Sequence, residues 1–212
     1  MTRLEIITRF REECPEITER VISDSVLGSW CEIGDLEVAC RARIIVGDVT
    51  FAAIVGQSSY DITAEEPKFY DCDEFPGGGV SFDDDRLDHT TIGELDSDEP
   101  SWRTNSNGTP DSYYRRGKYI NFNRPPDATS DIQVYTVLKS DPFDDDAKTP
   151  FNQLTHLEPF HYAIVLYLIM RAKAKVGKPE ERTAAMAEYG SYVSWIQKSL
   201  GGNKYGPISL HP

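Results

Sequence analysis

The stretch PFHYAIVLYLIMRAKAKV, residues 159–176, decides the fold. Every residue from Tyr162 to Met170 is apolar or aromatic, so a helix formed here has no polar face and needs cover on all sides. The run is shorter than the roughly 20 apolar residues that cross a bilayer. Pro159 suits the first turn of a helix, and Gly177 suits its end. The sequence therefore predicts the central helix of a bundle in a soluble protein.

Three further segments have the spacing of helices that could cover this stretch. Thr2 and Glu5 predict a capping box before a first helix, and Ser23 predicts the N-cap of a second helix that extends to about residue 42. Gly28 and Gly34 lie inside the second helix, where glycine is unfavourable, and this favours close-packed neighbours. The third helix, residues 179–200, is expected to place these residues on one side: Ala185, Tyr189, Tyr192, Trp195, Ile196 and Leu200.

The chain between residues 44 and 139 has a different texture, with short β-branched runs separated by glycine. Residues 80–82, 119–122 and 132–139 read as strands, and a short helical turn is expected around Thr91–Leu95; otherwise we expect only strands and loops. The predicted fold class is α+β, a helical bundle with an inserted small β-sandwich or barrel. The expected parts are a bundle from residues 1–45 and 150–202, a β-rich insertion at 46–140, a linker at 141–149 and an extended C-terminal arm at 203–212.

Charge is unevenly distributed in this 212-residue chain, whose net charge is −13. Between Asp61 and Ser101, fourteen acidic residues stand against two basic ones, which leaves twelve negative charges in that segment. A protein that grips the phosphates of nucleic acid needs the opposite sign. We expect these acids either to form a solvated face or to line something that must not adhere to DNA. The residues assigned to this acidic channel or surface patch are Asp83, Asp84, Asp85, Asp88, Asp96, Asp98 and Glu99.

No catalytic, metal or cofactor site is predicted. The four cysteines are far apart and form no CxxC pair, so we expect reduced, buried thiols rather than zinc ligands or disulfides. The acidic runs at 83–85 and 144–146 do not match a calcium-binding loop, which alternates its ligands and needs a glycine and a distal glutamate. Residues 1–13 lack the apolar core of a signal peptide, so synthesis in the cytoplasm is expected.

A more specific pattern of turn and apolar residues runs through residues 87–139. It resembles the middle of phage adaptor proteins, the head-to-tail connectors of tailed bacteriophages. The positions that carry the resemblance are Leu87, Thr91, Glu94–Asp96, Pro100–Trp102, Gly108–Pro110, Tyr113–Tyr114, Ile120–Phe122, Pro125–Asp127 and Ile132–Tyr135. The resemblance extends over nearly the whole chain, but Cys31 and Gly34 depart from the usual pattern, and residues 64–79 and the tail after Gly201 match it less well.

The resemblance implies a structural virion protein that is not an enzyme and needs no cofactor. It implies a homo-oligomeric ring, a dodecamer, that sits beneath the portal protein, extends the DNA channel and docks tail or neck proteins. Double-stranded DNA would pass through without specific binding, no membrane is involved, and an acidic wall would give DNA nothing to adhere to. The apolar spacing of the C-terminal arm predicts that it docks on the portal or a neighbouring subunit through Tyr205, Pro207, Ile208 and Leu210.

Two alternative functions make different predictions. A carbohydrate- or receptor-binding module would present Trp102 or Tyr113 as a solvent-exposed aromatic platform, whereas a connector would bury the same rings. A carboxylate-based hydrolase would fix two carboxylates across a cleft and separate their pKa values.

Overall fold

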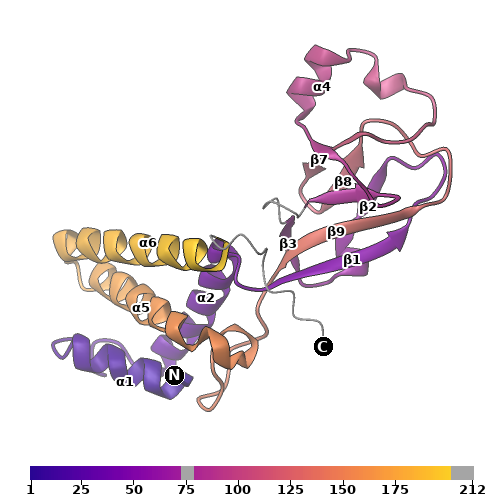
Figure 1. Ribbon diagram of the computed structural model, residues 1–212. Helices are drawn as coiled ribbons and strands as arrows, with labels where there is room; N and C mark the ends of the chain where they lie inside the picture. Colours follow the sequence, from indigo (N-terminus) through magenta and orange to yellow (C-terminus); the bar gives the residue numbers. More distant parts are fainter. Residues whose placement is uncertain (73–78, 202–212) are drawn as a thin grey trace. The chain divides into compact units, whose positions relative to one another are not determined.

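The computed structural model describes residues 1–72 and 79–201 and shows an α+β protein (Figure 1). The described residues form six α-helices and two β-sheets. They divide into two compact units. The helical unit consists of Met1–Ile45 together with the chain from Lys139 to the end of the last helix, and the sheet unit is Val46–Leu138.

Four α-helices and two short 3-10 helices build the helical unit. Their bounds are α1 Arg3–Glu13, α2 Asp24–Ala42, η2 Phe151–Gln153, η3 Thr155–Phe160, α5 Tyr162–Lys175 and α6 Pro179–Gly201. The predicted capping box is confirmed, because Thr2 accepts from the Glu5 amide and Glu5 accepts from the Thr2 amide. Ser23 is also confirmed as the N-cap of α2, and its hydroxyl accepts from the Val26 amide.

Helix α5 is the centre of the helical unit, as its sequence predicts. Every residue from Ala163 to Leu168 is buried, and α1, α2 and α6 all pack on α5 (Figure 1). The helix begins at Tyr162, later than expected, because Pro159 lies in the 3-10 helix η3. It ends where predicted, with Gly177 in the left-handed region at φ +73°. Cover is incomplete at the first residue of the helix and beyond Leu168, since Tyr162, Ile169 and Met170 are only half-buried.

Gly34 lets α2 and α5 approach closely. A Cβ atom at this position would lie 2.8 Å from Cδ1 of Tyr167 and 3.3 Å from Cγ2 of Ile164. At Gly28, one and a half turns earlier, the nearest atom to such a Cβ would be 3.6 Å away, in the side chain of Arg3. The expectation of a close neighbour thus holds most strongly at Gly34. The unfavourable helix propensity of glycine is offset there by close packing against α5.

Helix α6 packs on α5 through a narrower stripe than its sequence predicts. Ala185, Tyr189, Val193 and Ile196 are buried, but Trp195 is 46% exposed and Tyr192 is half-buried. Trp195 contacts Tyr192, which the sequence places on the same side of the helix, but its ring is not covered. Its neighbour Ile196 continues the stripe at the i, i+3, i+4 and i+7 spacing, which leaves Trp195 on the flank of the helix.

Two sheets form the sheet unit. The strands are β1 Val46–Ala52, β2 Ser59–Asp61, β3 Phe69–Cys72, β4 Val80–Phe82, β5 Asp85–Arg86, β6 Asp88–His89, β7 Ser112–Arg116, β8 Tyr119–Phe122 and β9 Asp131–Leu138. One sheet has the order β1-β9-β4-β5, with β3 also paired to β9, and the other has the order β2-β8-β7-β6. Among the strand pairs that the structure describes, β6 with β7 is the one parallel pair. The three predicted strands are confirmed as β4, β8 and β9.

The inner faces of the two sheets share one apolar core. Phe82 of β4 meets Phe122 of β8 with ring centroids 6.1 Å apart, and Ile132, Val134 and Ile120 are fully buried in the same cluster. The described strands do not close into a barrel, so that form of the predicted insertion is not adopted.

Short helices also occur in the sheet unit. The turn expected around Thr91–Leu95 is confirmed as helix α4, Ile92–Asp98, and the 3-10 helix η1 follows at Trp102–Thr104. The expectation of strands and loops elsewhere is wrong at α3, Ile62–Glu65, which Asp61 caps through the Thr63 amide. A single turn of helix is too short to show a 3.6-residue period.

The glycine contacts predict opposite effects for two alanine substitutions in α2. Gly34→Ala should lower the free energy of unfolding by about 1–3 kcal/mol, because overpacking against Tyr167 outweighs the gain in helix propensity. Gly28→Ala, the matched control, should raise it by up to about 1 kcal/mol. Urea unfolding followed by circular dichroism at 222 nm measures both. Equal shifts in the same direction would contradict the close approach at Gly34.

Candidate functional site

Asp83, Asp84 and Asp85 lie at a hairpin turn in the sheet unit. Asp83 and Asp84 form the two-residue connection between β4 and β5, and Phe82 pairs with Asp85 across it. Both turn residues have positive φ, 53° and 66°, a conformation that aspartate tolerates better than most residues. All three side chains are exposed. Turn geometry thus explains these residue types without a ligand, while their charges remain on the surface.

Two of the predicted acids on or next to helix α4 are held by neighbours. Asp96 pairs with the guanidinium of Arg103 and accepts a hydrogen bond of 2.8 Å from Nε1 of Trp102. Arg103, followed by Trp102, lowers the pKa of Asp96 below its ordinary value. Glu99 accepts from Nδ2 of Asn105 at 3.0 Å. Both residues therefore stabilise the α4 region through these contacts and also give it negative charge.

Basic residues from β7 and from the turn between β7 and β8 neutralise further acids of the sheet unit. Arg115 pairs with Asp71, and Nζ of Lys118 lies 2.6 Å from the carboxylate of Asp61. These bases follow residue 101, so the count of charges along the acidic segment did not include them. Within residues 1–72 and 79–201, no ion pair involves these predicted acids: Asp83, Asp84, Asp85, Asp88 and Asp98.

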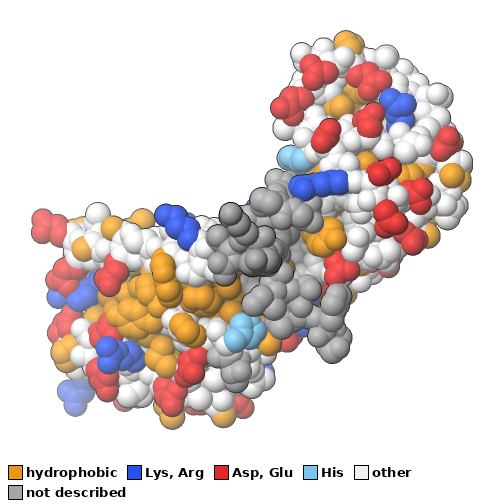
Figure 2. Space-filling view, viewed as in Figure 1, with side chains coloured by type: hydrophobic (Ala, Val, Ile, Leu, Met, Phe, Trp, Pro, Cys, Tyr) orange, Lys and Arg blue, Asp and Glu red, His pale blue; other side chains and the backbone are white. Residues whose placement is uncertain are grey.

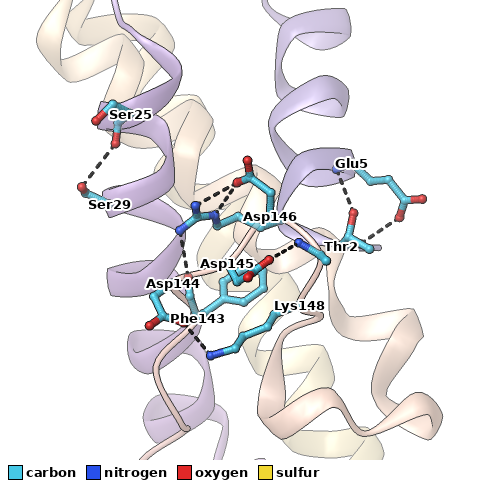
Figure 3. Close-up of polar contacts among 11 residues, drawn as sticks. Thr2, Glu5, Ser25, Ser29, Phe143, Asp144, Asp145, Asp146 and Lys148 are labelled. Atoms are coloured by element: carbon cyan, nitrogen blue, oxygen red, sulfur yellow. Dashed lines mark hydrogen bonds and ion pairs between the residues drawn. The ribbon is translucent and has the colours of Figure 1, made fainter.

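In the helical unit, the acidic run 144–146 anchors the connecting loop to α1 (Figure 3). Asp146 pairs with Arg3 at 2.8 Å, and Asp144 pairs with Lys148 at 2.5 Å. The loop also caps the helix, because the amides of Arg3 and Leu4 donate to the carbonyls of Lys148 and Asp146. An open groove of about 330 Å³ adjoins Arg3 between α1 and α2. Asp146 thus anchors the loop to α1, and Asp144 stabilises the loop itself.

Asp35 is a buried carboxylate that sequence reasoning missed. It is 1% exposed, and burial raises its pKa to about 6, although hydrogen bonds from Ser140 and the Phe151 amide oppose that shift. The Phe151 amide donates to it at 2.8 Å, at the start of a left-handed turn in which Phe151, Asn152 and Gln153 all have positive φ. Such a turn costs roughly 1–2 kcal/mol per residue. Asp35 therefore stabilises the strained connection that precedes α5, and its carboxylate is too buried to contact a substrate.

Four aromatic residues form a continuous cluster at the surface of the helical unit, which we call the aromatic face: Trp195 is exposed, Tyr162 and Tyr192 are half-buried, and Phe160 is buried. Ring centroids are 5.4 Å apart for Phe160 and Trp195, 5.1 Å for Tyr192 and Trp195, and 5.7 Å for Tyr162 and Tyr192. Figure 2 shows hydrophobic side chains gathered on this unit between α6 and α1. The sequence places Trp195 on the same side of the helix as Tyr192 but does not reveal that its ring is exposed, so this surface was not predicted.

The rings that a receptor-binding platform would need are buried. Trp102 is 8% exposed and Tyr113 is 1% exposed, as the connector hypothesis predicts. Among the described residues, no group of three or more histidine, cysteine, aspartate or glutamate side chains is placed to bind a metal. The predicted docking residues Tyr205, Pro207, Ile208 and Leu210 lie outside the described residues.

Comparison with protein families identifies the class. The family model described as SU10 adaptor protein matches residues 1–203. The chain belongs to the SU10 adaptor protein family. This is a family of phage head–tail adaptors, which confirms the resemblance found in residues 87–139. No curated protein matches the chain.

Membership of the SU10 adaptor family makes this a structural protein of the phage virion that interacts with portal or tail components. The match ends at residue 203, so nine of the ten residues of the proposed arm lie beyond it. No helix among the residues that the structure describes is long and apolar enough to cross a membrane. All four cysteines are buried, and none of them forms a disulfide within the described residues.

Burial of Asp35 predicts a specific pH dependence. Its folded-state pKa of about 6 exceeds the ordinary value near 3.9, so its contribution to stability is fully present below about pH 4 and is lost as pH rises through 6. Asp35→Asn keeps an acceptor for the Phe151 amide and removes the charge. Its stability relative to wild type should therefore be greater at pH 8 than at pH 4.5, by about 2 kcal/mol. Urea unfolding at both pH values measures this, and an unchanged difference would contradict ionisation of a buried Asp35.

Proposed function

We propose that the chain is the head-to-tail connector of its virion, a ring that lies beneath the portal, extends the DNA channel and docks the tail. The observation that carries this proposal is the family match across residues 1–203. In this proposal the protein is a helical bundle of residues 1–45 and 150–202 that bears the β module 46–140 as an insertion, with residues 141–149 as linker. This proposed role does not require the protein to catalyse a reaction.

The existence of two cores supports a role in joining two partners. The helical unit is organised by α5, and the sheet unit by residues such as Ile120 and Ile132, so each has its own apolar interior. One unit can then contact the portal or neighbouring copies while the other contacts the tail or neck. A ring of such copies, a dodecamer, requires one heterologous interface that repeats to closure.

The unpaired acids support the proposed conduit for DNA. Asp83, Asp84 and Asp85 are exposed at the tip of a hairpin, and Asp88 and Asp98 are exposed nearby in the sequence. Negative charge on a channel wall repels the DNA backbone, which lets double-stranded DNA pass without specific binding. Asp96 and Glu99 contribute less to this repulsion, because Arg103 and Arg124 lie close to them.

Assembly on the portal tests the proposed function. Purified chain mixed with purified portal rings should bind as a closed ring of about twelve copies, which native mass spectrometry counts directly. A chain that stays free, or that binds in single copies, would contradict the proposal.

Charge reversal at the hairpin tests the conduit. The triple substitution of Asp83, Asp84 and Asp85 by lysine should slow DNA ejection several-fold, because the wall would then attract phosphates. The triple substitution by asparagine is the matched control: it removes the charges and tolerates the left-handed turn. Near-ultraviolet circular dichroism should show a folded sheet unit in both variants. Normal packaging and ejection by particles that carry the lysine variant would exclude a repulsive role for these acids.

A further inference from the structure

The aromatic face is an apolar surface that the helical unit leaves open. Helix α5 packs against α1, α2 and α6, and α2 contacts both α1 and α6. The side of α5 that faces none of these helices lies between α1 and α6, and Tyr162 is on it. The ring of Tyr162 contacts Tyr192 of α6, and its hydroxyl donates to Glu13 of α1 at 2.9 Å. Hydrophobic side chains are visible between α1 and α6 in Figure 2. An exposed tryptophan within such a cluster is typical of a contact surface.

The rim of this face is acidic beside Tyr162 and Tyr192, whereas the cation Lys198 follows Trp195 by three residues on α6. The guanidinium of Arg9 pairs with both Glu12 and Glu13. Its nitrogen atoms lie 3.4 Å from the carboxylate of Glu12 and 2.7 Å from that of Glu13. Glu188 lies four residues before Tyr192, on the same side of α6, and its charge acts on the hydroxyl of Tyr162. An occupant that combines apolar side chains with a positive charge therefore complements the aromatic face.

The C-terminal segment NKYGPISLHP, residues 203–212, has this chemistry. It carries Tyr205, Ile208 and Leu210 as apolar side chains and Lys204 as a cation. One residue, Gly202, separates it from α6, which ends at Gly201 and bears Tyr192 and Trp195. Ten residues span up to about 33 Å. A helix is about 10 Å wide, so a fully extended segment of this length can cross about three packed helices of an adjacent copy.

We infer that the aromatic face of each copy binds residues 203–212 of a neighbouring copy. This inference rests on the proposed ring and names the surface that receives the arm. Because the arm and the face differ, the contact is heterologous and points from each copy to the next in one direction, as a closed ring requires. The apolar side chains of the arm cover Trp195 and Tyr192, and Lys204 approaches the acidic rim.

Two exposed residues of α6 provide a matched pair for the test. Trp195 is 46% exposed and Met186 is 48% exposed, and nine residues of helix place them on opposite sides of α6. Trp195→Glu should weaken ring formation on portal at least tenfold, and Met186→Glu should leave it unchanged. Deletion of residues 203–212 should cause a similar loss without changing the melting temperature of the free subunit. The deletion combined with Trp195→Glu should be no worse than the deletion alone, because both remove one interaction.

Photo-crosslinking keeps the inference testable if Trp195→Glu fails to fold. A photoreactive phenylalanine analogue replaces Tyr205, and rings are assembled from a mixture of isotopically light and heavy chains. Crosslinks should join residue 205 to peptides that contain Tyr192 or Trp195, and should join light chains to heavy ones.

Rings whose crosslinks reach another surface, the portal or only the same chain would overturn the inference and leave the proposed function intact. Full additivity of the deletion and Trp195→Glu would overturn it as well. If no ring forms on portal with the unaltered chain, the proposed function fails, and the inference fails with it.

Discussion

Because the residues Ala163–Leu168 of α5 carry no charge and are all buried, this helix can exist only under cover from other segments. The cover comes from both ends of the chain, α1 and α2 before the strands and α6 after them. The helical unit therefore closes only when residues more than a hundred positions apart meet. Gly34 against Tyr167 is the tightest such contact among the glycines of the described chain, and the Arg3–Asp146 pair adds a polar one.

The elements that depend on local chemistry could be predicted from the sequence. The capping box at Thr2, the N-cap at Ser23 and the stop at Gly177 each depend on one or two residues and their neighbours, and all three are present. The exposure of Trp195 was not predicted, because a helical stripe of apolar residues does not reveal how much of it the neighbouring helices cover. Asp35 and Arg3 were missed because their partners, Phe151 and Asp146, are distant in sequence.

The acidic surface shows the same difference between local and distant information. Counting charges between residues 61 and 101 located the excess of acids but could not show which acids have partners. Three basic residues that follow residue 101 form ion pairs with acids of this segment: Arg103 with Asp96, Arg115 with Asp71 and Lys118 with Asp61. The hairpin Asp83–Asp85 remains exposed, so the part of the charge available to a passing polyanion is smaller and more localised than the composition indicates.

An adaptor is defined by where it lies in the particle, so an image of that place is the most direct test. Electron cryomicroscopy of the intact virion should show a closed ring of this chain immediately below the portal, with its helical and sheet units resolved in every copy. The central claim would be contradicted if the density below the portal belonged to another protein, or if this chain were found elsewhere in the particle.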